Sequence, residues 1–146
     1  MLAIRKAIAD KLAEQGHKMP LYSGAIVLGL VFRFPVPATG SRAQRYASHN
    51  TLRPKRPDLD NLEKQFCDAM NGVLWADDSQ VCAKFSCKVS DIGKEGSTSV
   101  YVRELDPDAC FDFRTEVDCV AAALPFEDVV LPPLPPKESK KKPSRA

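Results

Sequence analysis

Long apolar runs are missing from this sequence of 146 residues. The longest lies between Gly24 and Arg33, far short of the roughly 18 residues that a membrane-spanning helix needs. The first residues alternate charged and apolar side chains and lack the apolar centre of a secretory signal peptide. A membrane protein is therefore excluded, and we expect one soluble domain that is large enough to bury a core.

Paired metal-binding or nucleophilic residues are also scarce. The five cysteines form no C-x-x-C pair, and neither of the two histidines, His17 and His49, has a cysteine or serine at motif spacing. This pattern predicts reduced thiols in a cytoplasmic protein and disfavours a disulfide framework, a zinc site and Ser-His or Cys-His catalysis. No glycine-rich phosphate loop is present either, which disfavours a hydrolase of small nucleotides.

Acidic residues are absent from Gln15 through Pro57, although this stretch holds seven lysines and arginines. From residue 58 onward acidic residues outnumber basic ones by six, so the net charge of +2 conceals a strong asymmetry. A basic stretch joined to an acidic one indicates a polyanionic partner with acidic chemistry beside it. On charge alone, a solvated loop with a few arginines explains the pattern equally well.

Apolar periodicity predicts an α+β domain, in which a small mixed sheet has helices packed on one side. The strand before Pro35 is apolar on both faces, so we expect both to be covered. The segment over 38–57 is expected to be a long loop, and the last two strands to pair as an antiparallel hairpin. The predicted elements are helices over Ile4–Gln15 and Asp60–Asn71 and strands over Gly24–Phe34, Ser79–Val89 and Thr98–Leu105.

Three segments divide the chain. Residues 1–105 contain all of these elements and form the expected main domain. Residues 106–124 are a C-terminal extension, whose apolar spacing indicates a helix over Arg114–Leu124. Residues 125–146 hold half of the 12 prolines and a run of lysines, a composition typical of a disordered tail.

The most informative stretch runs from Asp58 to Val81. On the predicted helix, Asp60, Lys64 and Asp68 lie within about 80° of one another and opposite the apolar stripe. Asp60 is expected to cap the helix with Glu63 as its capping-box partner. Asp58 precedes the helix, and Asp77 and Asp78 precede the following strand, so three carboxylates can converge on one point.

Converging carboxylates repel one another unless a cation lies between them. Because no His or Cys is close by, the ion would be Mg²⁺, with Mn²⁺ as a substitute. Such a site beside Lys64 and a basic loop suits hydrolysis of a phosphodiester. A helix cap, a surface ion pair between Asp60 and Lys64, and a turn at Asp77 explain the same residues one at a time, so residue chemistry alone leaves both explanations open.

The order and spacing of Asp58-Leu59-Asp60-Asn61-Leu62-x-Lys64, then Asp68-Ala69-Met70, then Asp77-Asp78-Ser79-Gln80-Val81 resemble the signature of the RusA family of Holliday junction resolvases. The resemblance implies a small homodimeric, Mg²⁺-dependent endonuclease, commonly encoded by phages, that nicks four-way DNA junctions symmetrically during recombination and repair. Family members usually begin with a further strand, whereas this chain begins close to its first helix.

The resemblance also implies roles for individual residues. Asp58, Asp60 and Asp78 would bind the metal, and Lys64 would be the catalytic lysine. The supporting residues would be Asn61, Asp68, Asp77 and Gln80, which orient their neighbours.

The basic loop supplies the expected contacts to DNA phosphates, and Tyr46 could stack on an unpaired base. An alternative function is a non-catalytic DNA-binding protein that keeps the fold. The predicted phosphate-contacting residues are Arg42, Arg45, Arg53, Lys55 and Arg56.

Overall fold

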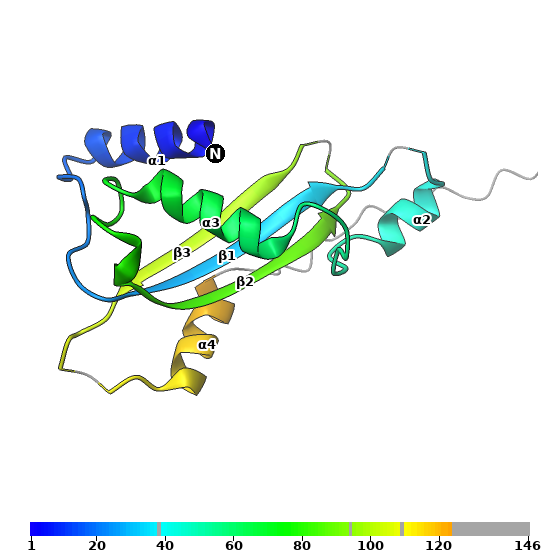
Figure 1. The fold of residues 1–146 in the computed structure, drawn as a ribbon. Coiled ribbons are helices and arrows are strands. Elements are labelled where there is room, and N and C mark those ends of the chain that lie inside the picture. Colours follow the sequence, from blue (N-terminus) through cyan, green and yellow to red (C-terminus); the bar gives the residue numbers. More distant parts are fainter. Residues whose placement is uncertain (38, 94, 109, 124–146) are drawn as a thin grey trace, which may run out of the picture.

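The fold is taken from a computed structural model, which describes residues 1–37, 39–93, 95–108 and 110–123. The tail predicted for residues 125–146 lies outside this part of the chain. Figure 1 shows the elements in order: α1 (Leu2–Glu14), β1 (Ile26–Pro35), α2 (Arg42–Ala47), α3 (Leu59–Met70), the short 3₁₀ helix η1 (Asp78–Gln80), β2 (Val81–Asp91), β3 (Ser97–Glu104) and α4 (Phe113–Ala123).

The three strands form a mixed sheet in the order β2-β1-β3. β1 runs parallel to β2 and antiparallel to β3, which confirms the α+β class with a small mixed sheet. The predicted β2–β3 hairpin is wrong, because β1 lies between these two strands. Seven successive residues of β1 are buried, and a strand that is apolar on both faces gains most from the central position. The connection from β2 to β3 crosses the end of β1, where a Cβ atom on Gly96 would lie 3.0 Å from the Arg33 carbonyl oxygen.

Helices α1 and α3 cover one face of the sheet, as expected. The predicted apolar stripe of α3 is buried: Leu62, Phe66 and Met70 pack with Leu28, Leu30 and Phe32 of β1 and with Trp75.

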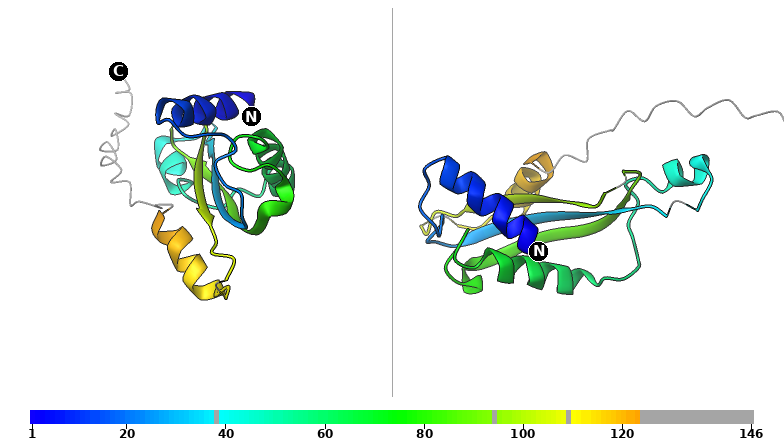
Figure 2. Two further views of the ribbon diagram at one scale, coloured as in Figure 1. Left: turned by 90° about the vertical axis from the view of Figure 1, so that its left-hand side faces the viewer. Right: turned by 90° about the horizontal axis from the view of Figure 1, so that it is seen from above.

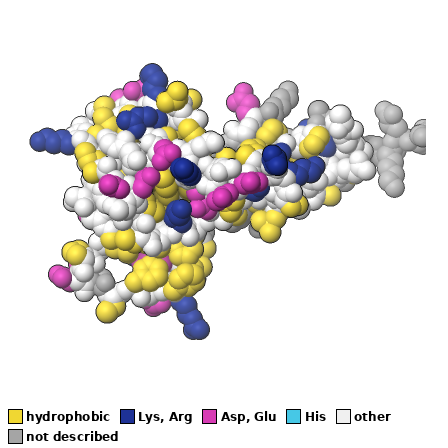
Figure 3. Space-filling view, viewed as in Figure 1, with side chains coloured by type: hydrophobic (Ala, Val, Ile, Leu, Met, Phe, Trp, Pro, Cys, Tyr) yellow, Lys and Arg dark blue, Asp and Glu magenta, His cyan; other side chains and the backbone are white. Residues whose placement is uncertain are grey.

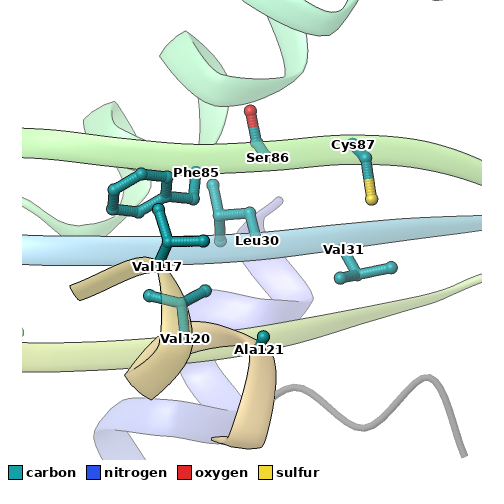
Figure 4. A pocket seen from close by; sticks show the side chains of 8 residues that line it. All are labelled: Leu30, Val31, Phe85, Ser86, Cys87, Val117, Val120 and Ala121. Carbon is teal, nitrogen blue, oxygen red and sulfur yellow. The ribbon is translucent and has the colours of Figure 1, made fainter. Parts of the chain in front are cut away.

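The helices are not confined to that face, however, which corrects the prediction of helices on one side. Val120 of α4 packs against Val27, Val31 and Val89 on the opposite face of the sheet, and Figure 2 shows α4 on the far side of the strands from α1 and α3. The physical reason is again that β1 has two apolar faces to cover. Between α4 and the sheet lies an apolar cavity of about 210 Å³, lined by side chains that include Val31, Phe85, Cys87 and Val117 (Figure 4).

The ends of the long helices follow local sequence signals. Gly16, at a φ of 77°, ends α1, and the amides of Gly16 and His17 donate to the carbonyls of Ala13 and Leu12, a Schellman arrangement. Arg5 donates to the carbonyl oxygens of Ala69 and Asn71 at the C-terminal end of α3, where a cation is favoured.

Two local predictions are wrong. Asp58, not Asp60, is the N-cap of α3 and makes no side-chain capping bond. Glu63 is therefore no capping-box partner; it binds side chains of β2. The segment expected to be a loop contains α2, which begins with a capping box formed by Ser41 and Gln44.

Within the described residues, no helix is both long and apolar enough to cross a bilayer. All five cysteines are free thiols, as predicted.

Replacing Phe66 tests the core between α3 and the sheet. Its side chain is fully buried, so Phe66→Ala is expected to lower the free energy of unfolding by about 3–5 kcal/mol. Phe111→Ala is the matched control, because Phe111 is 48% exposed, and we expect a loss of about 1 kcal/mol or less. Urea denaturation measures both; equal losses would contradict this description of the core.

Candidate active site

The outer side of α3 presents the acidic motif to solvent. Asp58, Asp60, Lys64 and Asp68 are exposed, as is Asn61. In the described part of the chain these five side chains form no ion pair or hydrogen bond with another residue. In particular, Asp60 and Lys64 are not joined as a surface pair. Figure 3 shows acidic side chains along α3 with basic ones beside them.

Asp58 and Asp60 stand at the N-terminal end of α3, where the helix dipole is positive and favours negative charge. Two carboxylates are tolerated together at this end for that reason. Both remain available to a cation or to the water around it.

Asp77, Asp78 and Gln80 shape the segment that enters β2. Asp77 caps η1 by accepting from the Ser79 amide at 2.9 Å, and the Gln80 side chain accepts from the amides of Ala76 and Asp77. The same Gln80 amide donates to the carbonyls of Tyr22 and Gly24 at 3.2 and 3.1 Å. These bonds tie η1 to the segment before β1.

Asp78 is half-buried, and its Oδ1 atom accepts a hydrogen bond of 3.1 Å from Nε1 of the buried Trp75. Trp75 pairs with Asn71, directly after α3. The carboxylate of Asp78 is therefore held near the C-terminal end of α3. Asp58 and Asp60 lie at the opposite end of that helix.

An additional charged pair lies between α3 and β2. Nζ of Lys84 is 2.9 Å from Oε2 of Glu63, and the Ser86 hydroxyl donates to the same carboxylate. The sequence pattern did place Lys84, Ser86 and Lys88 on one polar side of the strand. That side faces α3, so these residues lie beside the motif although the motif does not include them.

The thiol of Cys67 on α3 is buried and has charged residues around it. Burial, followed by the negative charge of Asp78 and smaller contributions from Glu63 and Asp68, raises the pKa of Cys67 to about 11, while Lys84 opposes the shift. The raised pKa therefore comes first from burial of the thiol, and the charge of Asp78 adds to it.

Lys88 fixes the chain just before Asp58. Its Nζ atom donates to the carbonyl oxygens of Lys55 and Pro57 at 2.7 and 2.8 Å. A single side chain from β2 thus holds the backbone that leads into the acidic motif.

The predicted phosphate-contacting residues differ in their exposure and in whether their side chains already have partners. Arg42 lies 5.2 Å over the Tyr46 ring and donates to its hydroxyl at 3.0 Å, and Arg53 lies 4.4 Å over the Phe34 ring. Arg45 is half-buried. Lys55 and Arg56 are exposed and carry no side-chain partner within the described residues. Figure 3 shows basic side chains at the end of the molecule that carries α2.

A family model described as endodeoxyribonuclease RusA matches residues 2–103. The chain belongs to the RusA family. The match spans α1 through β3 and includes every residue of the acidic motif, whereas α4 lies beyond it. No curated protein matches the chain. RusA membership makes the protein an enzyme of the endodeoxyribonuclease class and confirms the resemblance that the spacing of the motif indicated.

Lys88→Met tests the clamp on the segment before Asp58. Losing two hydrogen bonds to a charged donor is expected to speed amide exchange in residues 53–60 about tenfold, equivalent to about 1.4 kcal/mol. Lys84→Met is the matched control on the same strand, because Lys84 binds Glu63 of α3 and does not contact that segment. Unchanged exchange in Lys88→Met, measured by mass spectrometry, would show that the clamp does not order this backbone.

Alkylation of Cys67 tests its burial and raised pKa. With a pKa of about 11, only about one molecule in a thousand carries the reactive thiolate at pH 8. We expect the exposed Cys82 and Cys110 to react with iodoacetamide at pH 8 while Cys67 stays unlabelled, and labelling of Cys67 to rise as the pH approaches 11. The unfolded chain, in which all five react, is the control; rapid labelling of native Cys67 at pH 8 would argue against its burial and raised pKa.

Proposed function

We propose that this chain is a divalent-metal-dependent endodeoxyribonuclease that resolves Holliday junctions by paired symmetric nicks. The observation that carries the proposal is the RusA match over residues 2–103, together with the free acidic face of α3 inside that match. The first 105 residues would be the nuclease domain. The segment from 106, which includes α4, would be an extension of it.

The donor chemistry of the motif fits a hard divalent cation, because Asp58, Asp60 and Asp78 offer only carboxylate oxygens. The described residues nevertheless contain no group of three or more His, Cys, Asp or Glu side chains arranged to hold a metal ion. Asp58 and Asp60 would hold Mg²⁺, or Mn²⁺ in its place, at the start of α3, and Asp78 would have to approach them. When bound, the ion would lower the pKa of a water nucleophile and offset negative charge on the phosphate oxygens.

The chain's own groups account for the rest of the chemistry. Lys64 is one helical turn from Asp60, is exposed and has no side-chain partner among the described residues, so its ammonium can approach a phosphate oxygen that gains charge. Lys55 and Arg56 would bind flanking phosphates. Lys88 orients Asp58 by holding the carbonyls that precede it.

A homodimer suits the proposed reaction. A four-way junction has near two-fold symmetry, and a two-fold dimer presents each active site to an equivalent strand. Paired nicks then follow from two identical sites acting on one junction.

Asp60→Asn tests the proposed chemistry. We expect junction cutting in Mg²⁺ to fall by about 100-fold or more, while gel-shift affinity for the junction is kept or improved, because the substitution removes a charge that repels DNA. Asp10→Asn is the control, because Asp10 pairs with Lys6 on α1, outside the motif. This variant should cut junctions at the normal rate. Full cutting by Asp60→Asn would remove its proposed role.

The test also separates the alternative function. Junction binding without nicking by the unaltered chain, across a titration of Mg²⁺ and Mn²⁺, would favour a non-catalytic DNA-binding protein that keeps the fold. Nicks that never occur as pairs on one junction would contradict the proposed symmetric mechanism and leave the nuclease activity intact.

A further inference from the structure

We infer that Leu52 is an apolar wedge that separates two stacked bases at the branch point of the DNA, next to the proposed nuclease site. The inference rests on the proposed function. It assigns a role to a residue outside the acidic motif.

Leu52 is 74% exposed, although its backbone is firmly held. The segment around it pairs with the outer edge of β2: the Arg53 amide donates to the Lys88 carbonyl, and the Ser90 amide donates to the Thr51 carbonyl at 2.9 Å. Leu52 itself bridges to Val89. A large apolar side chain is therefore presented to solvent by a fixed backbone, without a mobile loop.

Two separate hollows share Leu52, Arg53 and Pro54 in their lining. One, of about 260 Å³, is lined in part by Leu59, Cys87 and Lys88. The other, of about 240 Å³, is lined in part by Val36 and Thr51. Both are smaller than the 300–1,000 Å³ of drug-sized ligand sites, a scale that suits one ring system. Each hollow can receive one of two bases that a side chain at Leu52 forces apart.

The surroundings have the charge that DNA requires. Arg53, Lys55 and Arg56 follow Leu52 directly, and Lys88 lines the first hollow. Leu59, in the same hollow, lies between Asp58 and Asp60. Basic groups can hold the phosphates on either side while the leucine enters the stack, and the opened step then lies beside the acidic face of α3.

Apolar side chains, leucine among them, are used by DNA-bending proteins to unstack base steps. Unstacking a base costs less where the regular paired duplex is broken than inside a continuous duplex, and a branch point is such a break. Tyr46 suits this role less well than Leu52. It is half-buried, and Arg42 covers its ring and binds its hydroxyl.

The test uses a four-way junction with 2-aminopurine at the branch point, whose fluorescence rises when the base unstacks. In an Asp60→Asn background that prevents cutting, we expect the full chain to raise the fluorescence and Leu52→Ala to reduce that rise at least fivefold. Leu2→Ala is the matched control, since Leu2 is 82% exposed on α1, and it should give the full rise. Leu52→Met should restore the signal because it also supplies a long apolar side chain.

A second arm uses Asp60 intact. We expect Leu52→Ala to cut a fully paired junction about tenfold more slowly and to regain its rate on a junction already mismatched at the branch point. Circular dichroism checks that Leu52→Ala is folded. An undiminished fluorescence rise, or equal slowing on both junctions, overturns the wedge alone. Failure of the unaltered chain to bind branched DNA overturns the proposed function as well.

Discussion

The two apolar faces of β1 are the constraint on which the rest of the structure depends. Because residues 26–32 are buried on both sides, β1 must lie inside the sheet and must be covered above and below. That requirement places β2 and β3 on its flanks, α1 and α3 over one face and α4 over the other. Helix α3 packs its apolar side on β1 and contacts the edge strand β2 through Glu63. These two contacts leave the side of α3 with Asp60, Lys64 and Asp68 facing solvent.

Polar groups of β2 connect this core to the proposed site. Lys84 and Ser86 bind Glu63, whose side chain is only 17% exposed, and Lys88 holds the backbone before Asp58. Removing a carboxylate from water is costly unless it is paired and hydrogen-bonded. Glu63 reaches both of its partners only when α3 lies opposite Lys84 and Ser86 of β2. The interaction therefore contributes more to the placement of α3 along β2 than to stability as such.

The sequence was sufficient to locate the long helices and the strands, but not to say which strands pair. Apolar periodicity located α3 and its buried stripe, because Leu62, Phe66 and Met70 recur on one side of a helix. Alternation along β2 and β3 identified two strands and their faces, but alternation carries no information about which strand lies beside which, and the hairpin was wrong for that reason. Helix α2 was missed because six residues are too few for a periodic signal, although Ser41 and Gln44 have the spacing of a capping box. Of the site, motif spacing predicted the acidic residues and Lys64, but the expected convergence of Asp78 with Asp58 and Asp60 is not found among the described residues. The contacts of Lys84 and Lys88 depend on their position on β2, which only the register of the sheet fixes.

An edge strand with free amides and carbonyls can pair with another chain. The outer edge of β2 is instead covered by a segment of the same chain that leads into the proposed site. The segment around Leu52 pairs with its outer edge at Lys88 and Ser90, while the side chain of the same Lys88 reaches the carbonyls of Lys55 and Pro57. One residue of the strand thus binds the basic segment twice, first by its backbone and then by its ammonium group. Leu52 and Asp58 consequently belong to a single rigid unit attached to the sheet. A DNA step opened by the leucine would keep a fixed position relative to the carboxylates, as cutting at a defined phosphate requires.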